Sequence, residues 1–293
     1  MKGIILAGGS GTRLYPMTKC ISKQLLPLYD KPMVYYPLSV LMLADIKEIL
    51  IISNPESLLL YEILLGDGSD IGLKIEYAVQ QKPGGLAEAL IIGSTFVGDD
   101  SVCLILGDNV LYGQGLTTIL NNARNITQND DEAVVFGIEV KNPKEYGVAE
   151  LNTSGEIVSL EEKPKNPKSN NAVIGLYMYP NQALSLVKDI KRSARGEKEI
   201  TSLNEKFLKI NKLSYKQLGR GFIWFDTGTP RSLKEATDFV QSVQLRQGKK
   251  IACIEEIALK KGFISEKKLN SIITNIGDNE YSAYIYKVIT RLK

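Results

Sequence analysis

Short apolar runs alternate with amphipathic segments along the first half of the chain. The runs have the length of buried strands, and the segments between them have helical spacing. The expected strands are Ile4–Ala7, Ile49–Ser53, Ile75–Val79 and Val102–Leu106, and the expected helices are Val34–Ala44, Ser57–Leu65, Leu86–Ile92 and Leu116–Arg124. This alternation predicts an α/β fold with a largely parallel sheet that helices cover on both faces.

The pattern changes near residue 130, where strands begin to dominate. They are expected at Ala133–Val140, Gly147–Leu151, Ile157–Glu161 and Val173–Tyr179, with later helices at Gln182–Lys188, Leu203–Ile210 and Ser232–Gln247. Three charged, amphipathic helices follow at Glu255–Lys261, Ser265–Ile273 and Tyr281–Leu292. The sequence therefore divides into one large unit over 1–247, whose halves meet near 130, and a helical appendage over 248–293.

A glycine-rich loop follows the first expected strand directly. It contains Gly8, Gly9, Ser10, Gly11, Thr12 and Arg13, and Lys23 lies ten residues further on. Glycine lets backbone N–H groups crowd a phosphate, and the basic side chains supply positive charge. The glycines alone are equally compatible with a tight turn. The loop fails the Walker pattern, because Thr12 and Arg13 follow Gly11, and it fails the dinucleotide fingerprint at Leu14.

Composition excludes several catalytic mechanisms and argues against some classes of binding partner. Lysine and arginine number 36 against 33 acidic residues, and the net charge of +3 is too mild to suggest nucleic acid as a partner. Histidine is absent, which excludes Ser-His-Asp and Cys-His nucleophile systems and His-ligated metals. Three widely spaced cysteines fit a reducing compartment. No run approaches the roughly 18 apolar residues of a membrane span, so we expect a soluble, cytoplasmic protein without a membrane partner.

Two N-terminal motifs together resemble the sugar nucleotidyltransferases. The first is the glycine loop, whose sequence is G-G-S-G-T-R-L. The second is S-K-Q-L-L-P at Ser22–Pro27, whose residues are most similar to those of the thymidylyl-transferring members. The resemblance covers nearly the whole chain. It implies a Rossmann-like, mixed and mostly parallel sheet flanked by helices, the nucleotide-diphospho-sugar transferase fold. The nucleotide-binding half would be about 1–130 and the sugar-phosphate-binding half about 131–247.

Two aspartates are candidates for a metal site. Asp108 follows the strand ending at Leu106, where a carboxylate could hold a hard cation or simply cap a turn. Asp226 lies in W-F-D-T-G-T-P, where capping of the next helix explains Thr229 and Pro230 but not the aspartate. The resemblance implies that both aspartates bind Mg²⁺ together with triphosphate oxygens.

The resemblance also assigns substrate-binding residues. Those for the nucleotide are Leu6, Gly8, Gly9, Ser10, Gly11, Thr12, Arg13, Gln24, Gln80, Pro83, Gly85 and Asp108, and those for the sugar phosphate are Lys23, Tyr146, Gly147, Glu162, Lys163, Val173, Tyr177 and Arg195. The catalytic set would be Arg13, Lys23, Asp108, Lys163 and Asp226. Without the resemblance, Glu162 and Lys163 suggest a solvated strand end, Val173 ordinary packing, and Arg195 an exposed loop.

Three positions depart from the family pattern. Gly84 stands where close relatives often have aspartate, Glu88 replaces a common glutamine, and Ser202 stands where aspartate is usual. The first two concern the expected base-reading loop and therefore bear on nucleotide preference. None of the three removes an expected metal or triphosphate contact.

The resemblance implies the reaction of dTTP with α-D-glucose 1-phosphate to give dTDP-glucose and pyrophosphate, the first step toward dTDP-deoxysugars such as dTDP-rhamnose. It also implies a homotetramer, often with feedback inhibition at a second site, for which the tail after residue 248 is our candidate. The alternatives are UTP or another sugar 1-phosphate as substrate, and a non-catalytic nucleotide-sugar sensor. A nicotinamide-dependent dehydratase would require the glycine fingerprint that this chain lacks.

Overall fold

This computed structural model of the chain describes residues 1–9 and 11–291. Ser10 and the end of the expected helix Tyr281–Leu292 lie outside the described residues. The strands are β1 (Lys2–Leu6), β2 (Pro27–Leu28), β3 (Lys31–Pro32), β4 (Glu48–Ser53), β5 (Lys74–Val79), β6 (Val102–Leu106), β7 (Val110–Gly113), β8 (Ala133–Glu139), β9 (Gly147–Leu151), β10 (Ile157–Glu162), β11 (Asn171–Tyr179), β12 (Leu213–Leu218) and β13 (Phe222–Phe225). The helices are α1 (Tyr35–Leu43), α2 (Pro55–Leu65), α3 (Glu88–Ile92), α4 (Ser94–Val97), α5 (Leu116–Asn125), α6 (Ala183–Leu186), α7 (Ile200–Lys209), α8 (Pro230–Gln247), α9 (Ile254–Lys260), α10 (Glu266–Ile276) and α11 (Glu280–Arg291).

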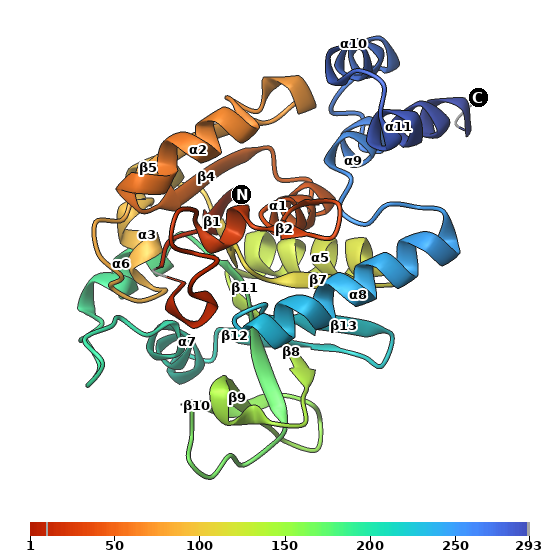
Figure 1. Ribbon diagram of the computed structural model, residues 1–293. Helices are drawn as coiled ribbons and strands as arrows, with labels where there is room; N and C mark the ends of the chain where they lie inside the picture. The colour runs from red at the N-terminus through yellow and green to blue at the C-terminus, as the bar shows by residue number, and fades with distance from the viewer. Residues whose placement is uncertain (10, 292–293) are drawn as a thin grey trace.

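A nine-stranded mixed sheet forms the centre of the molecule (Figure 1). Its order is β10-β9-β11-β6-β1-β4-β5, with β8 also paired to β11 and β12 paired to β8. Strands β6, β1, β4 and β5 are parallel, whereas β11 is antiparallel to β6. In β1, Ile5 packs into one core cluster and Ile4 into another, so both faces of the strand are buried. Burial on both faces explains the continuous apolar run, and the predicted α/β architecture is confirmed.

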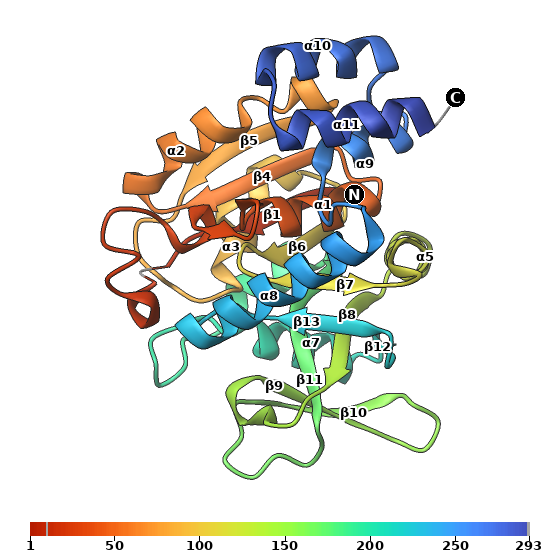
Figure 2. The ribbon, with the colours of Figure 1, turned by 45° about the vertical axis from the view of Figure 1, so that its right-hand side comes forward.

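Most expected elements lie within a few residues of their observed bounds. In the first half, for example, the helix expected from Leu86 begins at Glu88, and the helix expected from Ser57 begins at Pro55. The pattern missed the short hairpin β2–β3, the edge strand β12, and the ribbon of β7 and β13. In that ribbon the strands run antiparallel with Val110 opposite Phe225 (Figure 2). This pairing proves decisive for the site.

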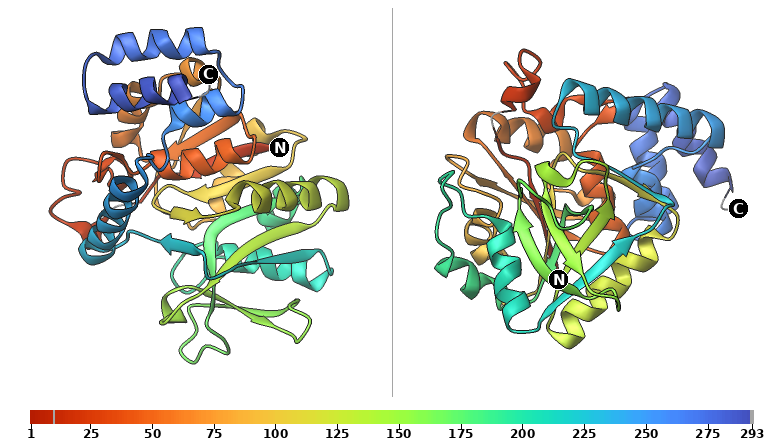
Figure 3. Two further views of the ribbon diagram at one scale, coloured as in Figure 1. Left: turned by 90° about the vertical axis from the view of Figure 1, so that its right-hand side faces the viewer. Right: turned by 90° about the horizontal axis from the view of Figure 1, so that it is seen from below.

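The C-terminal helices α9–α11 form a small hydrophobic cluster of their own. Its core includes Cys253, Leu269 and Ile285. Helix α9 packs on α1, and the cluster lies at the opposite end of the molecule from β9 and β10 (Figure 3). In the described part of the chain, no helix has the length and hydropathy needed to cross a bilayer.

An ion-pair cluster fixes the start of this tail to the β2–β3 hairpin. Asp30 accepts a hydrogen bond of 2.6 Å from Lys250 Nζ and also pairs with Lys31, whose residue is only 4% exposed. Burial alone would raise the pKa of the Asp30 carboxyl. The hydrogen bond from Lys250 and the charge of Lys31 outweigh it and hold that pKa below its ordinary value.

The mutation Asp30→Asn should destabilise the protein in a pH-dependent way. Breaking a buried pair costs about 3 kcal/mol near neutral pH. Because folding lowers the Asp30 pKa, this stabilisation is present above its ordinary value of 3.8 and is lost as pH falls through the lowered value. Urea unfolding of wild type and variant should therefore converge toward about pH 3 and below. Asp131→Asn, at the exposed pair with Lys212, is the control. If wild type and Asp30→Asn differed in free energy of unfolding by the same amount near neutral pH and at about pH 3, the expectation would be contradicted.

Candidate active site

The glycine loop after β1 lines a cavity of about 250 Å³. Its walls are Gly8, Gly9, Gly11, Thr12, Arg13, Lys23, Gln24, Asp108 and Gly228. Gly9 and Gly11 have φ angles of 110° and 57°, which L side chains rarely adopt, so glycine is needed at both positions. Strands β1 and β6 are parallel neighbours, and this places Asp108 beside the loop. A small polar cavity lined by backbone N–H groups and by the cationic side chains of Arg13 and Lys23 suits a polyphosphate.

Lys23 links the two expected metal ligands. Its residue is 7% exposed, and its Nζ lies 2.5 Å from Asp108 Oδ2 and donates to the backbone carbonyl of Asp226 at 3.3 Å. The buried ammonium is therefore satisfied by groups from two distant parts of the chain. Such an arrangement holds the carboxylate and the following loop at a fixed spacing.

The ribbon of β7 and β13 brings Asp108 and Asp226 together. Asp108 lies just before β7 and Asp226 just after β13, and antiparallel pairing places these ends opposite each other. Thr227 closes the junction, because its Oγ1 donates to the Asp108 carbonyl at 2.7 Å. Thr227 has a φ of 39°, an uncommon conformation for a β-branched residue. Local strain of this kind is typical of functional sites.

Asn109 is a positioning residue that the sequence reasoning missed. It is 3% exposed, and its Nδ2 donates to Asp108 Oδ1 at 2.9 Å. Its Oδ1 accepts from the Gly175 N–H at 3.2 Å and from Trp224 Nε1 at 2.6 Å. One amide therefore ties β11 and β13 to the carboxylate. The available signal was its place directly after Asp108 in the G-D-N turn.

Asn109→Ala should lower the free energy of unfolding by about 2–4 kcal/mol. The N–H groups of Gly175 and Trp224 would lose their acceptor, and an unsatisfied buried donor costs about 1–3 kcal/mol. Chemical denaturation measures the loss. Asn122→Ala, at an exposed position of α5, serves as control. A loss in Asn109→Ala no larger than that of the control would show that Asn109 does not anchor the site.

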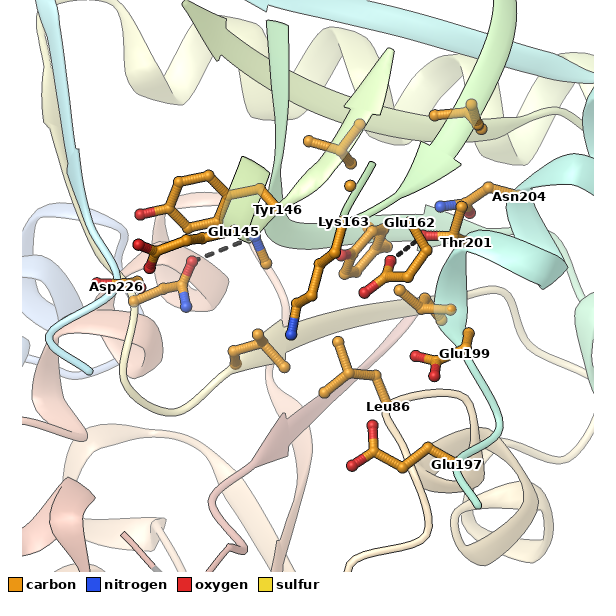
Figure 4. A pocket seen from close by; sticks show the side chains of 18 of the residues that line it. Leu86, Glu145, Tyr146, Glu162, Lys163, Glu197, Glu199, Thr201, Asn204 and Asp226 are labelled. Carbon is orange, nitrogen blue, oxygen red and sulfur yellow. Dashed lines mark hydrogen bonds between the residues drawn. The ribbon is translucent and has the colours of Figure 1, made fainter. Parts of the chain in front are cut away.

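A larger cavity of about 500 Å³ adjoins the first (Figure 4). The two share Arg13 and Asp108. The expected residues that line it are Arg13, Asp108, Tyr146, Gly147, Glu162, Lys163, Val173, Tyr177, Arg195 and Asp226. The structure therefore brings every expected sugar-phosphate residue except Lys23 into one cavity, and Lys23 lines the neighbouring one.

Acidic and hydroxyl groups line one wall of this larger cavity. Thr201 Oγ1 donates to Glu162 Oε2 at 2.5 Å, and Arg195 donates to Glu162 at 3.1 Å and to Glu199 at 2.8 Å. Burial alone would lower the pKa of Arg195, but Glu199 outweighs it and raises that pKa. Thr201 and Glu199 were missed, because nothing local marks a threonine or glutamate as a pocket residue. Carboxylates arranged in this way suit sugar hydroxyls.

Two further side chains face the same space. Lys163 has a φ of 44° and directs its ammonium into the cavity (Figure 4). Within the described part of the chain this ammonium forms no ion pair, so it is available to an anion. Burial, followed by the charge of Asp226, raises the pKa of Tyr146 to about 12. The phenol therefore stays neutral near pH 7 and can donate a hydrogen bond.

The expected base-reading residues line neither cavity. Gln80 is buried beside the glycine loop, where a Cβ on Gly8 would lie 2.9 Å from its Oε1. Gly85 has a φ of 100° and packs against the backbone of Lys198, and Pro83 is exposed. Leu6 ends β1, and its carbonyl accepts from the Gly107 N–H at 2.9 Å. Of these residues, Leu6 and Gln80 lie next to the glycine loop, and none of them forms a wall of either cavity.

The donor set fits a hard divalent cation. Asp108 and Asp226 line one cavity and offer carboxylate oxygens, which Mg²⁺ prefers. Among the described residues, no group of three or more His, Cys, Asp and Glu side chains is arranged to hold a metal. A cation here would therefore take its remaining ligands from phosphate oxygens and water, as Mg²⁺ commonly does.

Comparison with known proteins agrees with this geometry. A family model described as nucleotidyl transferase matches residues 2–243. Glucose-1-phosphate thymidylyltransferase of Neisseria meningitidis is 54% identical over 99% of this chain and 100% of its own, and that of Mycobacterium tuberculosis is 47% identical at the same coverage. A solved structure from Bacillus anthracis, assigned as a glucose-1-phosphate thymidylyltransferase and complexed with sucrose, has a TM-score of 0.75 and 40% identity over 82% of this chain and 94% of that chain.

A second solved structure belongs to a different enzyme of similar fold. UDP-glucose pyrophosphorylase complexed with UDP-glucose has a TM-score of 0.72 and 25% identity, covering 83% of this chain and 98% of that chain. The family resemblance that the two N-terminal motifs indicated is thereby confirmed. With a matching family model over most of its length and full-length relatives about half identical to it, the chain belongs to the nucleotidyl transferase family.

Proposed function

We propose that the chain is a glucose-1-phosphate thymidylyltransferase, which converts dTTP and α-D-glucose 1-phosphate to dTDP-glucose and pyrophosphate. The observation that carries this proposal is the pair of adjoining cavities that share Arg13 and Asp108. The smaller cavity suits a triphosphate, and the larger one suits a sugar phosphate. Full-length relatives that bear this enzyme name support the choice of substrates.

The chemistry is an in-line displacement at the α-phosphorus. A phosphate oxygen of glucose 1-phosphate forms the new P–O bond while the bond to the β-phosphate oxygen breaks and pyrophosphate leaves. A phosphomonoester has its second pKa near about 6, so the attacking group is already mostly a dianion at neutral pH. The absence of histidine is therefore no obstacle. Catalysis consists of alignment and charge neutralisation.

Each basic residue has a distinct place in this scheme. Lys163 and Arg195 would hold the phosphate of the sugar, since both line the larger cavity. Arg13, at the junction of the two cavities, would neutralise charge on the leaving pyrophosphate. Lys23 would lie between the two substrates and orient Asp108, to which it is hydrogen-bonded. Glu162 would accept hydrogen bonds from sugar hydroxyls.

Asp108 and Asp226 would hold a Mg²⁺ ion. When bound, the ion would neutralise charge on the triphosphate. On the nucleotide side, Gln80 and Gly85 would contact the base while the glycine loop cradles the phosphates, with Leu6 and Pro83 beside it. The position of Gln80 directly next to Gly8 supports this arrangement.

Pyrophosphate release tests the proposal. The purified protein would be assayed with Mg²⁺, glucose 1-phosphate, and dTTP or UTP in parallel. Release with dTTP well above that with UTP is the expected result. Absence of release with either nucleotide, and with other sugar 1-phosphates, would overturn the proposal and favour a binding-only role.

UTP is the second candidate nucleotide. The solved structure of UDP-glucose pyrophosphorylase in complex with UDP-glucose has a similar fold, which supports a uridine nucleotide as the alternative. A UTP preference in the same assay would keep the mechanism and change the assignment of the base site.

We also infer a regulatory or subunit-contact role for the tail, residues 248–293. A third cavity of about 350 Å³ lies between the tail and the α/β unit, with Tyr112, Lys250 and Glu256 among its walls. A homotetramer and a feedback ligand at this cavity are our proposals, and a monomer in gel filtration would remove the first. We propose a cytoplasmic location from the free cysteines.

A further inference from the structure

Glu88, one of the departures from the family pattern, contacts a residue of the proposed base site. It begins α3, and its Oε2 accepts a hydrogen bond of 2.7 Å from Gln80 Nε2. Its other oxygen, Oε1, accepts from Arg192 Nη2 at 3.3 Å. The carboxylate thus bridges Gln80 to a basic residue from the sugar half.

Gly84, the neighbouring departure, makes room for this contact. A Cβ at position 84 would overlap both carboxylate oxygens of Glu88. The φ of Gly84 lies outside the left-handed region, so it is the missing side chain, and not backbone freedom, that the site requires. The two departures are therefore coupled: the Glu88 carboxylate occupies the space that a side chain at 84 would fill.

A carboxylate determines which end of a neighbouring amide side chain faces it. It accepts hydrogen bonds and cannot donate, so Gln80 must turn Nε2 toward Glu88. Gln80 Oε1 then faces Gly8, and the residue is 7% exposed. If the amide were turned over, Oε1 would face the Glu88 carboxylate with no proton between two acceptors. The orientation of the Gln80 amide is thereby fixed.

We propose that Glu88 is a specificity-determining positioning residue, which fixes the Gln80 amide so that the base site accepts thymine or uracil and rejects cytosine. The inference rests on the proposed function, in which Gln80 reads the base. Thymine and uracil present an N3–H donor beside the O4 acceptor. Cytosine presents an N3 acceptor beside the N4 amino donor. Two hydrogen bonds to cytosine in the same pose require the opposite amide orientation.

The surrounding backbone keeps Glu88 in register with Gln80. The Lys198 N–H donates to the Gly84 carbonyl at 2.8 Å, and the Ala87 N–H donates to the Lys198 carbonyl at 3.2 Å. These bonds join the loop at 80–87, which carries the proposed base-reading residues Gln80 and Gly85, to the segment that carries Arg195. The backbone of this loop therefore keeps Glu88 beside Gln80, while Arg192 contacts only the carboxylate oxygen that does not accept from Gln80.

Equilibrium binding of dTTP, dUTP and dCTP to wild type and Glu88→Gln tests the inference. A glutamine at 88 can donate as well as accept, so it no longer dictates the orientation of Gln80. The ratio of dCTP to dTTP dissociation constants should fall at least about tenfold in the variant. The ratio of dUTP to dTTP should stay unchanged, because both bases present the same edge. Equal dCTP:dTTP ratios in wild type and variant would overturn the inference.

Two further variants sharpen the result. Gly84→Ala should reduce the same dCTP:dTTP ratio, because the added methyl displaces the Glu88 carboxylate from Gln80. Arg192→Gln should leave the ratio unchanged, because Arg192 contacts the other oxygen and does not touch Gln80. A loss of discrimination only in Arg192→Gln would overturn the assignment to Glu88. Turnover measured alongside separates the two hypotheses: discrimination lost on Glu88→Gln without any pyrophosphate release would uphold the role of Glu88 and refute the proposed reaction.

Discussion

Replacing Asp108 with asparagine should lower kcat by at least about 10²-fold, the effect expected when a charge-stabilising group is removed from a phosphoryl-transfer site. Asparagine retains the size of the side chain and an oxygen that can accept from Lys23, so the change removes charge more than shape. The carboxylate lines both cavities, where it would hold the cation that neutralises the triphosphate. Initial rates of pyrophosphate release at saturating Mg²⁺ measure the loss.

The matched control for this prediction is Asp70→Asn. Asp70 forms an exposed ion pair with Lys268 of α10, far from the cavities. It should leave kcat within about twofold, because exposed pairs contribute little. Unfolding curves for both variants separate lost catalysis from lost folding. A fully folded Asp108→Asn variant with near-normal turnover would exclude Asp108 from the cation site.

Replacing Arg13 with alanine should also lower kcat by about 10²-fold, with little loss of stability. Arg13 is exposed, and within the described residues it forms no ion pair, so the fold depends little on its charge. Its guanidinium lies beside Gly228, where an added Cβ would be 2.8 Å from Nη2, and it lines both cavities. It can therefore reach the phosphates where the two substrates meet.

Arg220→Ala is the control for charge alone. Arg220 is exposed at the turn between β12 and β13, and its loss should change kcat little. Arg13→Lys should recover part of the activity, because lysine keeps the charge but not the planar fork. If Arg13→Ala changed KM without changing kcat, Arg13 would bind substrate without stabilising the transition state.

The sequence predicted most local elements and the loops that follow β1 and β6. Buried parallel strands and capped helices leave local signals, such as the apolar run of β6 or Thr229 and Pro230 at the start of α8. In α8 the predicted cap is confirmed, since Thr229 accepts from the Ser232 N–H and Ser232 accepts from the Thr229 N–H. The glycine loop could also be predicted, because a backbone with positive φ favours glycine over the other residue types.

The remaining parts of the site depend on contacts between distant segments. The segment Phe222–Phe225, in which Ile223 stands among three aromatic residues, was available as a strand signal, but its partner β7 is only four residues long. Without that pairing, no local pattern places Asp226 opposite Asp108. Glu199 and Thr201 likewise acquire roles only through partners on other elements, so their types and neighbours in sequence are uninformative. Asn109 is marked only by its place after Asp108 in the G-D-N turn. The match to family motifs supplied what periodicity could not.

The closure of β7 by β13 also has a consequence for synthesis of the chain. Thr227 bonds to the carbonyl of a residue 119 positions earlier, so a nascent chain that ends before Phe222 holds the glycine loop and Asp108 but lacks the second carboxylate. Such a chain can bury the parallel strands of its first half while the proposed cation site is still incomplete. The chain therefore becomes able to catalyse the reaction only late in its synthesis. If the polypeptide is split between β7 and β13, the two fragments must reassociate before either can contribute to turnover.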